Sequence, residues 1–192
     1  MFEIFFDYIE TFLPLPKENR QQCRDNFEPH HFSKGSIIQE SGRAPEFHNF
    51  VVQGHLRKYS LDLKGHEQTI DLNQGPRFFT SYEYFMEQKP SPETIVALTE
   101  VKLLRASKAQ VDTMMQIGGQ VIRDFTIMVM QQAWEEEKRR LHERATISAK
   151  QRYLNFIERY PTLLEIVPLQ YIASYLGIQP ESLSRIRREI KA

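Results

Sequence analysis

Residues 169–191 read LQYIASYLGIQPESLSRIRREIK, which is a pattern of two short amphipathic helices separated by a tight turn. Apolar residues recur at helical spacing on both sides of the turn. They are Leu169, Ile172, Ala173 and Leu176 before it, and Leu183, Ile186 and Ile190 after it. Gly177 suits the position after a helix, where a left-handed backbone costs glycine little, and Pro180 suits the first turn of the next helix. The pattern predicts a helix-turn-helix.

The second helix of this pair has a polar face with a defined chemistry. At about 100° per residue, Glu181, Arg185 and Arg188 lie together, opposite the apolar residues. Arginine binds the two acceptors of a guanine edge, and glutamate accepts from cytosine. Other residues lie where duplex phosphates would pass, namely Gln179, Ser182, Ser184 and Lys191. DNA is therefore the predicted partner, and the alternative is a structural helical hairpin whose charged face is only solvated.

Composition sets the broad class of the protein. The chain has 192 residues, of which 41% are hydrophobic, enough for one large domain or two modest ones. Lys plus Arg and Asp plus Glu both total 25, so the net charge gives no preference for nucleic acid or membrane. From Thr146 onward, however, seven basic residues stand against four acidic ones, which makes the C-terminal part locally basic.

The single cysteine, Cys23, excludes an intramolecular disulfide and favours a reducing compartment. No apolar run approaches the ~20 residues that span a bilayer, and residues 1–7 lack the positive segment of a secretory signal. We expect a cytoplasmic protein without a membrane partner.

Glycines divide the first half of the chain into short segments. Gly35, Gly42, Gly54, Gly65 and Gly75 recur at intervals of 7 to 12 residues, a spacing typical of turns between antiparallel strands. The strands expected between and after them are residues 36–39, 47–53, 55–61, 68–72, 95–98 and 101–104. With no long helix between them, these strands favour a sandwich, roll or barrel, preceded by about 30 helical residues.

One long helix is expected over residues 120–145, which contain neither proline nor glycine. At ~1.5 Å per residue it would span about 40 Å, more than a domain of this size needs for its own core. Pairing with a second copy would explain that length. Two i,i+4 ion pairs are expected to support the helix, Glu135 with Arg139 and Glu136 with Arg140.

A β domain, a long helix and a terminal helix-turn-helix, in this order, resemble the CRP/FNR superfamily of bacterial transcription regulators. The matching motifs are Phe32-Ser33-Lys34-Gly35 with Ile38 and Gly42, residues 50–57 (FVVQGHLR), and residues 94–98 (TIVAL). The resemblance implies an α+β fold with a β-roll sensor over residues 1–118, a dimerisation helix over 119–145 and a DNA-binding domain over 146–192. It also implies a homodimer, base-reading roles for Glu181 and Arg185, and RNA polymerase as a further candidate partner.

The sensor departs from the cyclic-nucleotide-binding members of that family. They carry a Gly-Glu pair and an Arg followed by Ser or Thr, whereas here residues 78–83 read FFTSYE and Glu93 precedes Thr94. A carboxylate beside a phosphate repels it, so we expect cyclic AMP, the cofactor that the family implies, to bind weakly or not at all. The expected effector-pocket residues are Arg77, Phe79, Thr80, Ser81, Tyr82, Glu93 and Thr94. The aromatic residues Phe78, Phe79, Tyr82, Tyr84 and Phe85 would suit a less anionic ligand, or else simply form core.

Neither a metal site nor a catalytic site is expected. His30 and His31 are adjacent, so on a strand they point to opposite faces and make poor co-ligands. The chain lacks a nucleophile elbow, a phosphate-cradling glycine loop, paired catalytic carboxylates and a metalloprotease helix motif. The main rival to a DNA-binding regulator is a small-molecule- or protein-binding β-roll whose terminal helices mediate interaction only.

Overall fold

The computed structural model describes residues 1–191. The side chain of Lys191 and all of Ala192 lie outside the described residues, so the predicted phosphate contact of Lys191 is not tested. The helices are α1 (Phe2–Glu10), α2 (Lys17–Asn26), α3 (Tyr82–Glu87), α4 (Lys108–Ile117), α5 (Gly119–Thr146), α6 (Ala149–Arg159), α7 (Leu163–Ile166), α8 (Leu169–Leu176) and α9 (Pro180–Lys191). The strands are β1 (Glu28–Phe32), β2 (Ile37–Gln39), β3 (Phe47–Gln53), β4 (His55–Leu61), β5 (Glu67–Gln74), β6 (Arg77–Phe78), β7 (Glu93–Ala97) and β8 (Val101–Ser107).

The strands form two four-stranded antiparallel sheets that face each other as a β-roll. One sheet has the order β1-β8-β3-β6 and the other β2-β7-β4-β5. Between them lies an apolar cluster that includes Val51, Leu56, Ile95 and Leu103. The α+β fold with a β-roll is thus confirmed. Sequence analysis assigned no strand over β1 or β6 and no helix over α3, α4, α6 or α7. β1 has no polar–apolar alternation, β6 has two residues, and α3 lies in a short aromatic segment.

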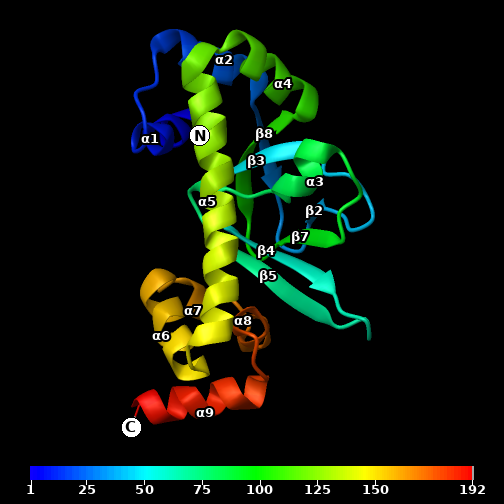
Figure 1. Cartoon of the computed structure of the whole chain (residues 1–192), viewed down its shortest axis with the longest axis vertical. Coiled ribbons are helices and arrows are strands. Elements are labelled where there is room, and N and C mark those ends of the chain that lie inside the picture. Colours follow the sequence, from blue (N-terminus) through cyan, green and yellow to red (C-terminus); the bar gives the residue numbers. More distant parts are fainter. Residues whose placement is uncertain (192) are drawn as a thin grey trace.

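The outer face of the β1-β8-β3-β6 sheet is covered by helices (Figure 1). Phe50 and Leu104 from this sheet pack with residues of α1, α2, α4 and α5 in one buried cluster. The expected helical N-terminus is confirmed as α1 and α2. Cys23 on α2 belongs to this cluster, and burial raises the pKa of its thiol to about 12. The thiol is therefore protonated at neutral pH.

The long helix α5 runs beside the β-roll and on to the C-terminal helices (Figure 1). Its first half buries Ile122, Phe125 and Val129 against the roll. The expected i,i+4 pairs are wrong. Arg139 instead pairs with Glu136 at 2.5 Å and Glu143 at 3.0 Å, and Arg140 turns to Asp71 of β5. A buried carboxylate attracts a guanidinium more strongly than an exposed one on the same helix does, because water screens the exposed charge.

Residues 1–191 show neither a grouping of metal ligands nor a helix suited to span a membrane. Within residues 1–191, no three His, Cys, Asp or Glu side chains are grouped in a way that would hold a metal ion. None of the helices described there combines the length and the apolar composition needed to cross a bilayer.

Gly54 joins β3 to β4 at a position that requires glycine. Its φ is +102°, and a Cβ built there would overlap the Glu100 carbonyl oxygen and lie 3.0 Å from Val101 Cα. We expect Gly54→Ala to lower the free energy of unfolding by about 3 kcal/mol or more, from a left-handed backbone plus overpacking. Gly65→Ala is the control, because Gly65 has φ +80° but open space around it. It should cost about 1 kcal/mol. Urea unfolding compares the two, and equal losses would contradict the steric argument.

Candidate nucleic-acid interface and effector cavity

The turn between α8 and α9 has the geometry expected from Gly177. Its φ and ψ are 69° and 38°, in the left-handed region. The Gly177 N–H donates to the Ser174 carbonyl and the Ile178 N–H donates to the Ala173 carbonyl, each at 3.0 Å. This pair of bonds is a Schellman motif, which satisfies the last carbonyls of α8. The predicted helix-turn-helix is therefore confirmed as a structural unit.

Helix α9 is held by one face and exposes the other. Leu183 is fully buried and Ile186 partly buried in the cluster that α6–α9 form with Leu72 of β5. The apolar spacing of Leu183, Ile186 and Ile190 predicts one buried face, which is wrong for Ile190: it is exposed, because α9 projects beyond the cluster at this end, as Figure 1 shows. The predicted base-reading residues are all exposed, namely Glu181, Arg185 and Arg188.

The predicted phosphate contacts differ in their accessibility. Gln179 and Ser184 are exposed, and Ser182 is half-buried. The Ser184 hydroxyl donates to the Pro180 carbonyl at 3.0 Å, while Arg185 donates to the Ser182 hydroxyl at 3.3 Å. Both hydroxyls already bond within α9, so of these side chains Gln179 is the more available to a ligand.

The helix-turn-helix is docked on the β-roll through a buried arginine. Arg57 of β4 is 2% exposed, donates to Thr69 at 2.9 Å and forms an ion pair with Glu67. Its guanidinium lies 3.7 Å from the ring centroid of Tyr171 on α8 and 4.5 Å from that of Tyr59 on β4. The Thr69 N–H also donates to the Ser174 hydroxyl of α8 at 2.8 Å. Cation–π stacking and hydrogen bonding therefore connect the two units.

A cavity of about 710 Å³ lies between the β-roll and α5. Six of the seven predicted effector-pocket residues line it, namely Arg77, Phe79, Thr80, Ser81, Tyr82 and Glu93. Thr94 is buried and is not among the lining residues. Of the other aromatic residues, Phe78 and Tyr84 line the cavity, whereas Phe85 lies in the core.

The wall contributed by α5 and β5 was missed by sequence analysis. It includes Trp134, Arg139 and Arg140 from α5 and Asp71 from β5. Arg77, which was expected in the effector pocket, pairs there with Asp71 at 2.5 Å. No local motif marks this wall, because Asp71 and the α5 residues are 63 to 69 positions apart and meet only in the folded chain.

Charged groups in the cavity are arranged in pairs. Lys58 lies 3.5 Å from Glu93, whose carboxylate also accepts from the Ser81 hydroxyl. Burial would raise the pKa of Asp71, but Arg77, Arg140 and Lys58 outweigh it and hold that pKa below its usual value. Burial raises the pKa of Tyr82, whose hydroxyl is buried without a hydrogen-bond partner. The cavity is thus polar, and its cationic side chains are paired with carboxylates of the protein.

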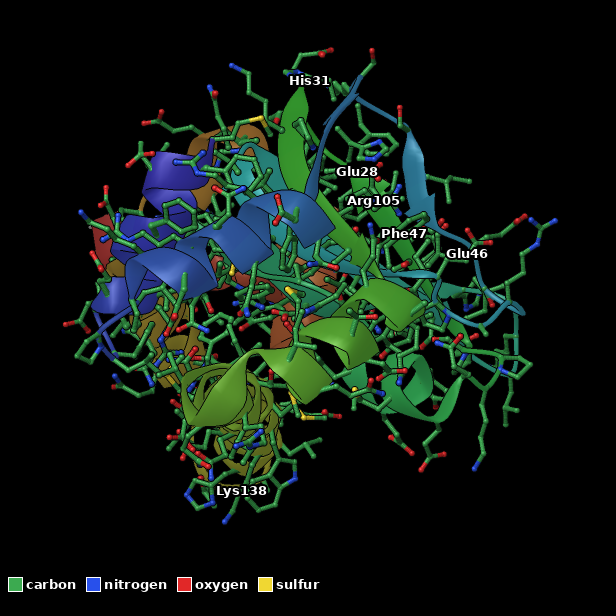
Figure 2. All side chains as sticks on the ribbon, turned by 90° about the horizontal axis from the view of Figure 1, so that it is seen from above. Glu28, His31, Glu46, Phe47, Arg105 and Lys138 are labelled. Carbon is green, nitrogen blue, oxygen red and sulfur yellow. The ribbon has the colours of Figure 1, made fainter. Side chains whose placement is uncertain are left out.

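A smaller hollow of about 340 Å³ lies at the ends of β2, β3 and β8. Figure 2 shows Arg105 there, near Phe47 and Glu46. Arg105 stacks 3.9 Å from the Phe47 ring centroid and donates to Asn49 at 2.8 Å. Burial lowers its pKa to about 10. These internal contacts assign Arg105 to the packing of the strand ends.

Comparison with known proteins agrees with this architecture. Residues 29–117 match the model of the cyclic nucleotide-binding domain, which is the class of domain that the β-roll and its cavity define. Over 86% to 94% of its length the chain has the fold of solved CRP/FNR-type regulators, so the resemblance predicted from sequence is confirmed at the level of domain and fold. No curated protein matches the chain by sequence.

Three solved structures illustrate the shared fold. FixK2 from Bradyrhizobium japonicum is 16% identical, with a TM-score of 0.73 over 86% of this chain and 84% of that one. The c-di-GMP-responsive regulator CLP from Xanthomonas campestris is 11% identical, with a TM-score of 0.69 over 89% of both chains. The catabolite activator protein of Thermus thermophilus is 16% identical, with a TM-score of 0.58 over 94% and 85%.

Docking through Arg57 predicts that Tyr171 contributes to the attachment of α8. We expect Tyr171→Ala to cost about 2 kcal/mol, the value of a desolvated cation–π contact, and to speed hydrogen exchange in α8. Tyr59→Ala is the matched control, because Tyr59 stacks on the same guanidinium from within the β-roll. It should leave exchange in α8 close to wild type. Equal exchange of α8 in both variants would contradict the assignment.

Proposed function

We propose that this protein is a CRP/FNR-type transcription regulator that binds a two-fold-symmetric DNA site as a homodimer in the cytoplasm, and that it is not an enzyme. The observation that carries the proposal is α9, which is anchored by buried Leu183 and presents Glu181, Arg185 and Arg188 to solvent. Side chains of this kind on one exposed helix suit base edges in a major groove. RNA polymerase is a further candidate partner.

The DNA-binding part of the proposal is tested by selecting sites from random DNA and titrating the selected site across salt. We expect a symmetric site whose affinity falls steeply with salt. Arg185→Ala and Arg188→Ala should each lose about 1 to 3 kcal/mol of specific affinity. Arg123→Ala is the charge-matched control, because Arg123 is an exposed arginine on α5, far from α9 in the chain.

The rival function makes the opposite prediction. If no site is enriched, or if folded Arg185→Ala and Arg188→Ala variants bind as wild type does, the terminal helices are an interaction module on a ligand-binding β-roll. A loss of affinity equal to that of Arg123→Ala would indicate only general attraction to phosphates.

The second copy is proposed to pair along α5. Three large apolar side chains on this helix are exposed and recur every seven residues, namely Ile127, Trp134 and Leu141. A seven-residue apolar repeat is the pattern by which two helices pack along their length. Lys138 stacks 5.2 Å from the Trp134 ring and lies on the side of α5 away from the roll, as Figure 2 shows. This stripe fits an identical stripe on a second chain.

Changing the stripe should therefore weaken the dimer. We expect Trp134→Asp combined with Leu141→Asp to raise the dimer dissociation constant at least 100-fold, roughly 3 kcal/mol, because each change occurs twice in a dimer. Leu63→Asp is the control, since Leu63 is fully exposed on the β4–β5 hairpin. Sedimentation equilibrium measures the effect. A wild-type chain that stays monomeric at micromolar concentration would contradict the proposal.

Regulation would act through the cavity that the β-roll shares with α5. A ligand that binds one arrangement of α5 more tightly shifts the population of dimers towards that arrangement, in which the two recognition helices are, or are not, spaced to enter the grooves of DNA. The size of the shift is limited by the difference in the ligand's affinity for the two arrangements. The effector is a small molecule of unidentified chemistry, or the protein acts without one.

A further inference from the structure

The deepest charge in the effector cavity belongs to the protein itself. Asp71 has 6% of its side chain exposed, and its carboxylate lies 2.5 Å from Arg77 Nη2 and 3.2 Å from Arg140 Nη1. A third contact is the Leu72 N–H, which donates to it at 2.8 Å. A carboxylate held between two guanidinium groups is the arrangement by which proteins bind an anion.

The two arginines come from different parts of the fold. Arg77 is on β6 of the roll, whereas Arg140 is on α5, where the surrounding surface is largely solvated. Arg140 nevertheless has 10% of its side chain exposed. Its Nη1 is buried without a hydrogen-bond partner, although it lies within ion-pair distance of Asp71. Asp71 therefore connects the β-roll to the long helix through an ionic contact with Arg140.

The remaining cations of the cavity are also occupied. Lys58 pairs with Glu93, and Arg139 pairs with Glu136 and Glu143. Each of the four Lys and Arg side chains that line the cavity thus has a carboxylate of the protein within 4.0 Å. An incoming phosphate or carboxylate would have to displace one of these, which costs a buried ion pair.

We infer that Asp71 is a resident anion: it occupies the guanidinium site of Arg77 and Arg140, ties α5 to the β-roll without a ligand, and makes the cavity reject anionic effectors. The inference extends the proposed function, because it assigns the ligand specificity of the proposed effector site to Asp71. Removing the carboxylate should uncover a site for a small monocarboxylate that fits the vacated volume. The effector of the native protein is then neutral or cationic.

The test is chemical rescue of Asp71→Ala by formate. We expect the variant to melt roughly 6 to 20 °C below wild type, as for a broken buried ion pair in a chain of this size. Formate should restore much of this loss saturably, whereas potassium chloride at equal ionic strength should not. Wild type should respond to neither salt beyond a small non-saturating change. The matched control is Asp112→Ala, because Asp112 pairs with Lys108 at 2.5 Å but is half-exposed on α4.

Trp134 provides a second readout, since it is the single tryptophan and lines the cavity. Its fluorescence should change with formate in Asp71→Ala but not in wild type. If Asp71→Ala does not fold, the isosteric Asp71→Asn is compared with Arg140→Gln and the double variant by urea unfolding. The double variant should then lose much less than the sum of the single losses.

Several outcomes would overturn the inference. They are an Asp71→Ala variant as stable as wild type, formate acting equally on Asp71→Ala and Asp112→Ala, additive losses in the double variant, or micromolar binding of cyclic AMP to wild type by calorimetry. None of these measurements uses DNA. A failed site selection would therefore remove the proposed function and leave this inference standing, and the reverse also holds.

Discussion

The architecture depends on one constraint, which is that α5 must pack against an apolar core along its first half and against a buried charged group along its second half. Its first half buries Phe125 and Val129 in the core that covers the β-roll. Its second half carries Arg140 into the buried ion-pair group with Asp71. Apolar burial supplies much of the stability, and the charged contact fixes where the helix lies, because an ion pair requires a specific geometry. These two contacts fix one of the supports of the C-terminal helices, and the other is the docking of α8 on the β-roll.

The C-terminal helices are fixed to the end of α5 by arginines that bind helix carbonyls. Arg144 of α5 donates to the Tyr175 carbonyl at 2.7 Å, and Arg152 of α6 donates to the Leu176 carbonyl at 3.0 Å. Cations stabilise the last turn of a helix, where carbonyl groups lack internal partners. Since α8 also contacts β5 through Ser174, it is attached both to the roll and to α5. A shift of α5 along the roll must therefore strain or break one of these attachments.

Sequence reasoning succeeded where the signal was local. The strands over residues 47–53 and 55–61, the long helix and the turn at Gly177 follow from periodicity and turn chemistry, and the structure has them there. It failed where contacts join distant residues: Arg140 was expected to pair within α5, but its partner is 69 positions earlier. The cavity was half predicted for the same reason, because most of the predicted residues lie in one segment, residues 77–84, whereas the α5 wall lies far from that segment in the sequence. The DNA contacts of α9 remain predictions.

The burial of Cys23 leaves the native chain without a reactive thiol of its own. Because the only sulfhydryl of the chain lies on the buried face of α2 and stays protonated, thiol-specific reagents attack it slowly while the native fold persists. Cysteines introduced at exposed sites on the β4–β5 hairpin and on α9 would then be the sole reactive groups. Dyes attached to that pair would follow the movement of one unit relative to the other in an otherwise unaltered chain.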